Sequence, residues 1–225
     1  MMKFVLGAAV FGALVALTVA SGSSAQGAEC VGVPATITGA GTITGTDGDD
    51  VIVGSPGADV IDARGDNDRV CGGQGSDTIL GGTGDDTLVG DDGVGGPTTP
   101  GGNDLIEGQN GNDELFGEGG NDAILGGNGD DFGAGFNGAD TISGGNGDDT
   151  FVGGPQNDVL NGDNGNDTLF GAFGNDTLNG GSGDDYLDGD LPNTPFVDPI
   201  PNSDTCNGGS GADAAANCEA TTSVP

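Results

Sequence analysis

The stretch Gly-Gly-Gln-Gly-Ser-Asp-Thr-Ile-Leu (72–80) is one copy of a nine-residue repeat that decides the fold, and Gly-Gly-Asn-Gly-Asp-Asp-Thr-Phe-Val (144–152) is another. Started at Gly45, the repeat runs sixteen times in unbroken register to Asp188. Position one is glycine in fourteen copies, and position four is glycine in all but two. Such internal periodicity indicates a solenoid, because each repeat forms one unit that stacks on its neighbours.

Position six of the repeat is aspartate in fifteen of the sixteen copies, and only Gly95 breaks the series. Carboxylates at this spacing are candidate metal ligands. They are Asp50, Asp59, Asp68, Asp77, Asp86, Asp104, Asp113, Asp122, Asp131, Asp140, Asp149, Asp158, Asp167, Asp176 and Asp185.

The spacing predicts Gly-x-x-Gly-x-Asp turns that alternate with three-residue strands. Glycine supplies the positive φ of tight turns and leaves the backbone carbonyls accessible to an ion. Side chains alternate along a strand, so position eight points inward while positions seven and nine point outward. Position eight is apolar in all copies but two, those with Pro97 and Gly133. Two repeats then make one flattened coil, and eight coils at about 4.8 Å per strand give a rod about 35 to 40 Å long.

These repeats resemble the RTX, or hemolysin-type, calcium-binding nonapeptide, and the resemblance covers about two-thirds of the chain. It implies an all-β fold, a parallel β-roll (two-sheet β-solenoid) of about eight coils, with calcium between stacked turns. By the same resemblance the fifteen aspartates donate carboxylate oxygens, turn carbonyls complete each shell, and the chain holds several calcium ions, roughly a dozen. All-oxygen coordination by flexible turns suits Ca²⁺ better than it suits zinc or copper.

The composition suggests that the ions are needed for folding. The chain has a net charge of −33, only 33% hydrophobic residues and 51 glycines. Low hydrophobicity with high charge is typical of disordered chains. Ions that bind only the folded form would shift the folding equilibrium toward the folded chain. We therefore expect calcium to fold this protein.

The first 28 residues read as a signal peptide. Lys3 precedes an apolar run over residues 4–20, and cleavage is expected after Ala25 or Ala28. The run could instead be retained as a membrane anchor, since it is near the lower length limit for a span. With cleavage, the mature chain is secreted, extracellular or associated with the cell surface, and has no membrane segment.

We divide the remaining chain into an N-terminal cap (29–44), a calcium-binding β-roll of sixteen nonapeptides (45–188) and a C-terminal region (189–225) that holds a loop insertion, imperfect terminal repeats and a cap. Within the roll, residues 90–98 lose both the aspartate and the inward apolar residue, which predicts a bulged loop. Residues 189–198 are an insertion, after which Asp204 and Asp213 indicate one or two imperfect repeats.

Four cysteines in an exported chain are expected to form disulfides, and three connectivities are possible. We predict Cys30 with Cys71 and Cys206 with Cys218, one at each end of the roll. Free thiols or intermolecular pairs are the alternative. Solenoid ends need such caps because their last strands are unpaired edges.

Two outward patterns recur. Asn110, Asn128, Asn146 and Asn164 lie eighteen residues apart and would stack along one edge. Separately, outward Phe116, Val152 and Phe170 would share one face of the roll and could mark a partner or dimer surface.

Composition also limits the function. The chain has no histidine, which excludes an HExxH metalloprotease or a Ser-His-Asp triad, and no Gly-x-Ser-x-Gly occurs, so we predict no enzyme. Its charge excludes nucleic-acid binding, which needs a basic surface. We expect a monomer or weak self-association, and calcium ion binding by an extracellular structural or surface module. A calcium-dependent adhesin that binds glycan, protein or ice is the alternative, and any cell-surface or matrix partner is left open.

Overall fold

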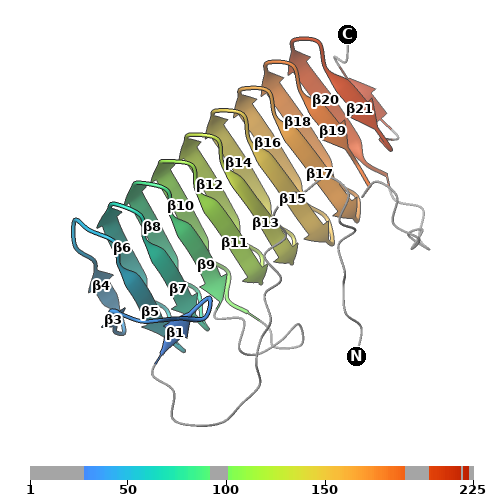
Figure 1. The fold of residues 1–225 in the computed structure, drawn as a ribbon. Helices are drawn as coiled ribbons and strands as arrows, with labels where there is room; N and C mark the ends of the chain where they lie inside the picture. The colour runs from blue at the N-terminus through green and yellow to red at the C-terminus, as the bar shows by residue number, and fades with distance from the viewer. Residues whose placement is uncertain (1–27, 92–100, 191–202, 219, 223–225) are drawn as a thin grey trace.

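The computed structural model describes residues 28–91, 101–190, 203–218 and 220–222. The chain winds into two long parallel sheets that face each other along one axis (Figure 1). Each of these sheets holds ten strands. The predicted all-β parallel β-roll is therefore confirmed. Within the described residues there is no helix, hence none that could span a membrane.

The two sheets separate the strands by number. The odd sheet contains β3 (Ile37–Thr38), β5 (Val51–Ser55), β7 (Arg69–Gly73), β9 (Thr87–Asp91), β11 (Glu114–Gly119), β13 (Phe132–Asn137), β15 (Thr150–Pro155), β17 (Thr168–Phe173), β19 (Tyr186–Asp188) and β21 (Ala214–Ala216). The even sheet contains β4 (Thr42–Thr44), β6 (Val60–Gly65), β8 (Thr78–Thr83), β10 (Leu105–Asn110), β12 (Ala123–Asn128), β14 (Thr141–Asn146), β16 (Val159–Asn164), β18 (Thr177–Ser182), β20 (Thr205–Ser210) and β22 (Ala220–Thr222).

Most strands are six residues long, so the prediction of three-residue strands was wrong. Pairing covers positions seven to nine, skips position one and resumes at positions two and three. On β10 and β12, for example, Gln109 pairs with Gly127 and Asn110 with Asn128. The skip bends each strand without ending it, so only positions four to six are left to form the turn.

Equivalent residues of neighbouring coils lie side by side, usually 18 residues apart in sequence. The separation grows to 27 where β8 pairs with β10, and to 28 where β18 pairs with β20. The coil that ends at Asp91 is thus in register with the coil that begins at Gly101. The same holds for the coils on either side of Asp190 and Ser203. The interpretations of 90–98 as a bulge and of 189–198 as an insertion fall largely outside the described residues, and the signal peptide call (1–28) falls almost wholly outside them.

Position-eight side chains form the core between the two sheets. They are almost completely shielded from solvent, as predicted: Ile52, Ile61, Val70, Ile79, Leu88, Ile106, Leu115, Ile124, Ile142, Phe151, Leu160, Leu169, Leu178 and Leu187. Gly133 leaves a gap in this column. A Cβ there would lie 3.0 Å from Cε1 of Phe151, so the phenyl ring of the next coil fills the space that Gly133 leaves.

Each end of the roll carries one disulfide, and the predicted pairing is confirmed. Cys30, in the antiparallel hairpin of β1 (Glu29–Cys30) and β2 (Val33–Pro34), is bonded to outward Cys71 of β7. At the other end Cys206 is bonded to Cys218. Cys206 also takes the inward position eight and is fully buried next to Leu178. Ile43 and Ile37 extend the core column at the first end.

Candidate metal-binding turns

The turns are built by the backbone conformation of position two. In most central repeats this residue has positive φ, as at Gly127 (120°) and Gly145 (111°). Gln109 (78°) and Glu118 (73°) adopt it although they carry side chains. Positive φ is unfavourable for L-residues but not for glycine, which has no Cβ. This explains why glycine recurs at position two. Thr46 and Ser55, at position two of the first two repeats, do not have positive φ.

All fifteen predicted aspartates point into the roll and are buried, with 7% exposure at Asp50 and 1% to 3% at the others. Asp204 and Asp213 of the terminal repeats join the same two columns, at 0% and 7%. One carboxylate oxygen, Oδ1, accepts a hydrogen bond from the backbone N–H of the position-six residue one coil earlier. The N–H of Asp122 donates to Oδ1 of Asp140 at 2.8 Å, and that of Asp131 to Oδ1 of Asp149 at 2.8 Å. Each column thus ties adjacent turns together.

The second carboxylate oxygen, Oδ2, is buried and receives no hydrogen bond in most repeats. This holds for Asp68, Asp77, Asp86, Asp104, Asp113, Asp122, Asp131, Asp140, Asp149, Asp158, Asp167, Asp176, Asp185 and Asp213. A buried charged oxygen without a partner is costly, and one such group per turn calls for a common explanation.

Asp50 and Asp59 differ from the rest. Oδ2 of Asp50 accepts bonds from Thr46, from its backbone N–H at 2.7 Å and from its hydroxyl at 2.9 Å. Oδ2 of Asp59 accepts a 2.6 Å bond from the N–H of Ser55. These two carboxylates are therefore satisfied by the protein itself, which the repeat pattern did not reveal.

In the central turns a carbonyl oxygen faces the same space as Oδ2. A Cβ on Gly108 would collide with Oδ2 of Asp113 and would lie 2.7 Å from the carbonyl oxygen of Gly126, one coil further on. The same three-part arrangement occurs at Gly126, with Asp131 and Gly144. A carboxylate oxygen without a donor beside a carbonyl oxygen suits a hard cation. No three acidic, histidine or cysteine side chains converge in the described residues, so backbone carbonyls must supply much of any shell.

Burial raises the pKa of most of these carboxyl groups. It is the largest cause; the N–H bond from the preceding coil lowers each pKa, and in most turns neighbouring aspartates raise it further. The pKa reaches about 8 at Asp104, Asp149 and Asp158, about 7 at Asp86, Asp122 and Asp176, and about 6 at Asp68, Asp77, Asp113, Asp140 and Asp167. Without a counter-charge, the groups whose pKa is about 7 or 8 would hold protons near neutral pH.

A second ladder runs through position five and was missed in the sequence. Its side-chain oxygens accept from the backbone N–H one coil later, the opposite direction to position six. The N–H of Asp148 donates to Asp130 at 2.9 Å, and that of Asn166 donates to Asp148 at 2.8 Å. The signal was the frequent Asn or Asp beside the position-six aspartate. These side chains are exposed, so the ladder stabilises turn stacking without burying charge.

The asparagines at position three stack as predicted. The amide of Asn128 donates to Asn110 at 3.0 Å, Asn146 donates to Asn128 at 2.8 Å, and Asn164 donates to Asn146 at 3.1 Å. Asn179 and Asn161 form a further pair at 2.8 Å on the face of the even sheet. Both patterns give hydrogen bonds along the roll axis.

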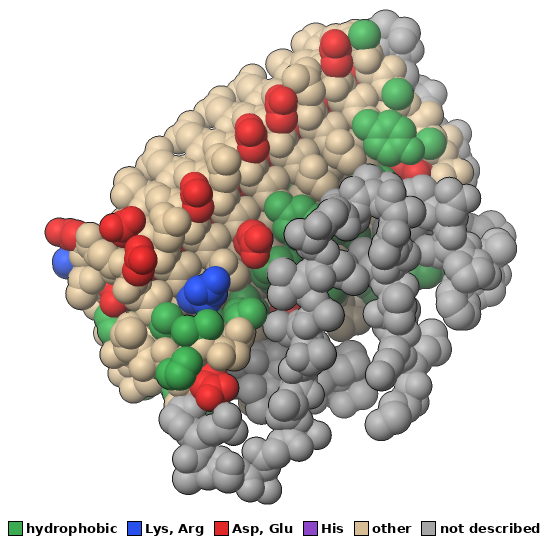
Figure 2. Space-filling model, in the orientation of Figure 1, with side chains coloured by type: hydrophobic (Ala, Val, Ile, Leu, Met, Phe, Trp, Pro, Cys, Tyr) green, Lys and Arg blue, Asp and Glu red, His purple; other side chains and the backbone are tan. Residues whose placement is uncertain are grey.

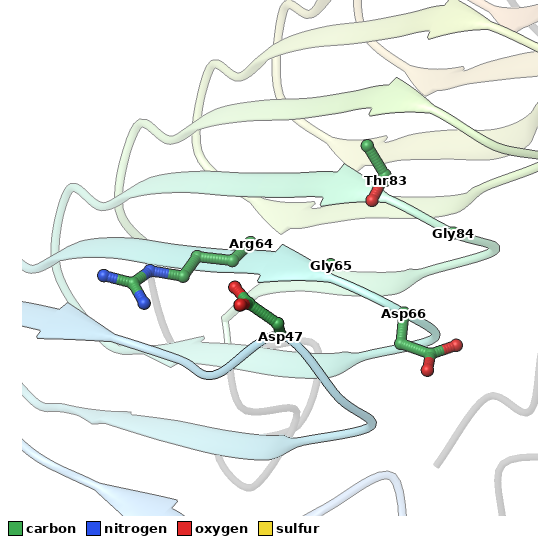
Figure 3. A pocket seen from close by; sticks show the side chains of 6 residues that line it. All are labelled: Asp47, Arg64, Gly65, Asp66, Thr83 and Gly84. Carbon is green, nitrogen blue, oxygen red and sulfur yellow. The ribbon is translucent and has the colours of Figure 1, made fainter.

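An irregular turn lies at the third repeat, where Arg64 and Asp66 both have positive φ (83° and 67°). It borders a shallow hollow of about 380 Å³ that is lined by Asp47, Arg64, Gly65, Asp66, Thr83 and Gly84. In Figure 3 the side chains of Arg64 and Asp66 point in opposite directions from this hollow. Since they do not converge, the hollow has no set of groups that would hold a small ligand.

Comparison with known families agrees with this geometry. The family model of the RTX calcium-binding nonapeptide repeat matches residues 44–79, 72–94, 101–132, 134–169 and 161–191, which together are more than half of the chain. No curated protein matches the sequence. The chain belongs to the family of RTX calcium-binding nonapeptide repeat proteins.

Proposed function

We propose that calcium binding in the turns folds this chain, and that the roll then serves as an extracellular structural or surface module. The observation that carries the proposal is the buried Oδ2 oxygen that recurs without a donor in the central turns. Calcium would supply the positive charge that compensates these buried carboxylate oxygens.

The ligands we propose are the position-six aspartates from Asp68 onward, whose Oδ2 has no protein donor, together with backbone carbonyls of the position-one glycines. Oδ1 of each aspartate is held by the N–H of the previous coil, which leaves Oδ2 aimed at the carbonyl of the next coil. Two stacked turns thus share one site, and binding requires that the coils be stacked. That requirement couples ion binding to folding.

The test is far-ultraviolet circular dichroism of the chain from Glu29, disulfides intact, during a calcium titration with magnesium as control. We expect a transition from coil to β structure that is specific to calcium. Isothermal titration calorimetry on the same sample counts the ions, for which we propose roughly a dozen. A chain already folded in chelator would contradict the proposal.

Export is part of the proposal. An apolar segment follows Lys3, and both disulfides close at the ends of the roll, as expected in an oxidising compartment. N-terminal sequencing of protein recovered from the culture medium should begin after Ala25 or Ala28. Protein found only in membranes with residues 1–28 attached would favour an anchor.

A calcium-dependent adhesin is the second candidate. The observation that favours it is that the two outer faces of the roll differ: among the residues that the structure describes, aromatic side chains lie on strands of the odd sheet and not on strands of the even sheet. Pull-down against cell-wall material with and without calcium tests this role. Capture that does not depend on calcium would count against it.

A further inference from the structure

The N-terminal end of the roll differs in composition from its centre. Residues 30–71 and residues 101–142 are two segments of equal length. The first contains 15 Val, Ile or Thr residues and 8 glycines, whereas the second contains 4 and 13. β-Branched residues favour strands, and each glycine loses more conformational entropy on folding than other residues do. The N-terminal segment therefore forms β structure at a lower entropic cost.

The same two segments differ in charge. Residues 30–71 contain seven aspartates and two arginines, which gives −5, and residues 101–142 contain nine acidic residues and no basic residue, which gives −9. In Figure 2 the basic side chains in view lie at the N-terminal end of the roll, whereas acidic side chains extend along its length. Self-repulsion between coils is therefore weaker at the N-terminal end.

The carboxylates of the first two turns are satisfied by neighbouring groups of the chain. Their Oδ2 atoms accept from the N–H of position two in the same repeat. Oδ1 of Asp50 accepts from the hydroxyl of Thr36 at 3.3 Å, and Oδ1 of Asp59 accepts from the N–H of Gly41. The first position-six Oδ2 without a donor belongs to Asp68. Before that residue, no buried position-six carboxylate needs an ion.

The N-terminal cap closes the open edge of the first coil. Strand β3 pairs with β5, and β4 pairs with β6. The N–H of Thr36 donates to the carbonyl of Val51 at 2.8 Å, and the N–H of Val51 donates back to the hydroxyl of Thr36 at 2.9 Å. The N–H of Val60 donates to the carbonyl of Gly41 at 2.7 Å. Both sheets thus have bonded first strands at this end.

The β1–β2 hairpin adds a third layer outside the odd sheet. Its Cys30 is bonded to Cys71 across 41 residues of sequence, a span that includes both satisfied turns. Around this disulfide pack Val31, Val51, Val53, Val89 and Phe116. Phe116 lies in one outward row with Val152 and Phe170, as predicted. At the N-terminal end the odd sheet therefore has apolar packing on its outer face as well as in the core.

The C-terminal end is built differently. Its disulfide, Cys206–Cys218, spans only 12 residues of sequence. Within that span, Oδ2 of Asp213 is buried without a donor. The outermost strand of the odd sheet there, β21, consists of three alanines. This end has a covalent link, but it lacks the satisfied carboxylates and the apolar packing of the N-terminal end.

We propose that residues 29–73, strands β1 to β7, fold without calcium and form a seed on which the other coils fold as they bind the ion. The first coil of a solenoid is the least favourable to form, because it has no neighbour to stack on. A preformed seed removes that step, so folding proceeds from the N-terminal end. In the free seed the turn of Asp68 is the open end, where water reaches Oδ2. The inference rests on the proposed function, since the seed is distinct only if the other coils need calcium.

The experiment is hydrogen exchange with mass spectrometry on the chain from Glu29, disulfides intact, in chelator. We expect the amides of Thr36, Gly45 and Val60, which donate to backbone carbonyls inside the seed, to exchange at least about a hundredfold more slowly than in an unfolded chain. Residues 101–188 should exchange at the rate of an unfolded chain until calcium is added.

The two disulfides provide matched variants. C30A/C71A removes the link that closes the seed, and C206A/C218A removes the link at the other end. In C30A/C71A we expect the slow exchange in chelator to be lost and folding after addition of calcium to be at least about tenfold slower. C206A/C218A should retain both the slow exchange and the folding rate of wild type.

The opposite results separate the seed from the proposed function. Fast exchange along the whole chain in chelator, followed by folding in calcium, rejects the seed and leaves calcium-driven folding intact. Slow exchange along the whole roll in chelator, or residues 101–188 that stay unfolded in calcium, rejects the proposed function. Slow exchange confined to residues 203–222 places the start of folding at the other end. Equal effects of the two disulfide variants also overturn the proposal.

Discussion

The first two turns of the roll and its central turns have the same aspartate at position six but complete its environment differently. Oδ2 of Asp50 and of Asp59 receives protein donors, from Thr46 and Ser55 respectively, whereas Oδ2 of Asp131 receives none. The cause is the residue at position two. Gly127 has φ of 120°, whereas Thr46 and Ser55 lack positive φ and point their N–H groups at the carboxylate. In these turns the backbone conformation of position two thus decides whether a protein N–H reaches Oδ2.

The largest expected effect comes from pH, because it acts on the central turns together. Burial raises the folded-state pKa of these aspartates from 3.8 to about 6 at Asp113, about 7 at Asp122 and about 8 at Asp104. A raised folded pKa gives stability that is complete below pH 4 and lost as pH rises to 8. In chelator, we therefore expect more β structure at pH 5 than at pH 8, since a protonated Oδ2 can donate to the carbonyl that faces it.

Circular dichroism between pH 4 and 8 with chelator measures this. With calcium present the trend should reverse, because protons compete with the ion, so the calcium concentration at the folding midpoint rises as pH falls from 8 to 5. A midpoint that is constant with pH would show that these carboxylates are not the ligands.

Asp131→Asn tests a central turn. It keeps the Oδ1 acceptor for the N–H of Asp113 but removes the negative charge. At calcium a hundredfold above its dissociation constant, loss of one ion costs about 2.7 kcal/mol of unfolding free energy. The difference in unfolding free energy from wild type should shrink as the calcium concentration is lowered. Calorimetry should count fewer bound ions in the variant than in wild type. The control is Asp130→Asn at exposed position five, where other repeats already carry asparagine, and its unfolding curve should match wild type.

Asp59→Asn tests an N-terminal turn. The new amide would face the N–H of Ser55 and leave two donors opposed, at a cost of about 1 to 3 kcal/mol. Because no ion is expected at this oxygen, the number of bound calcium ions should equal that of wild type. Urea unfolding at two saturating calcium concentrations, combined with calorimetry, separates the cost of the two opposed donors from the cost of a lost ion. A lower ion count would remove the distinction between the N-terminal and central turns.

Gln109→Gly has the smallest expected effect. Gln109 holds φ of 78°, which glycine adopts at little cost, so the variant should gain about 0.5 to 1 kcal/mol after its greater unfolded-state entropy is counted. Gln109→Ala keeps the strain and is the control. Thermal unfolding in calcium measures both. A loss of stability in the glycine variant would mean that the Gln109 side chain has a role that its backbone does not indicate.

Repeat position alone predicted much of this molecule. The nine-residue period placed Ile124 and Ile142 in one buried column and put Cys71 outward, where Cys30 reaches it. It aligned the fifteen aspartates but did not predict that they are buried. It did not predict six-residue strands, because the pairing of Gln109 with Gly127 depends on how coils stack. It also missed the position-five ladder, whose donors lie one coil away.

The sequence by itself determined the period, the two-sheet roll and the acidic column, because side-chain direction in a strand follows from position along the chain. Only the tertiary structure decided which carboxylates the protein satisfies. Asp50 and Asp131 occupy the same place in the repeat, yet their Oδ2 environments differ because the φ angle of position two directs an N–H toward the first and away from the second. Backbone conformation of this kind depends on the stacked neighbours, which a linear pattern does not contain.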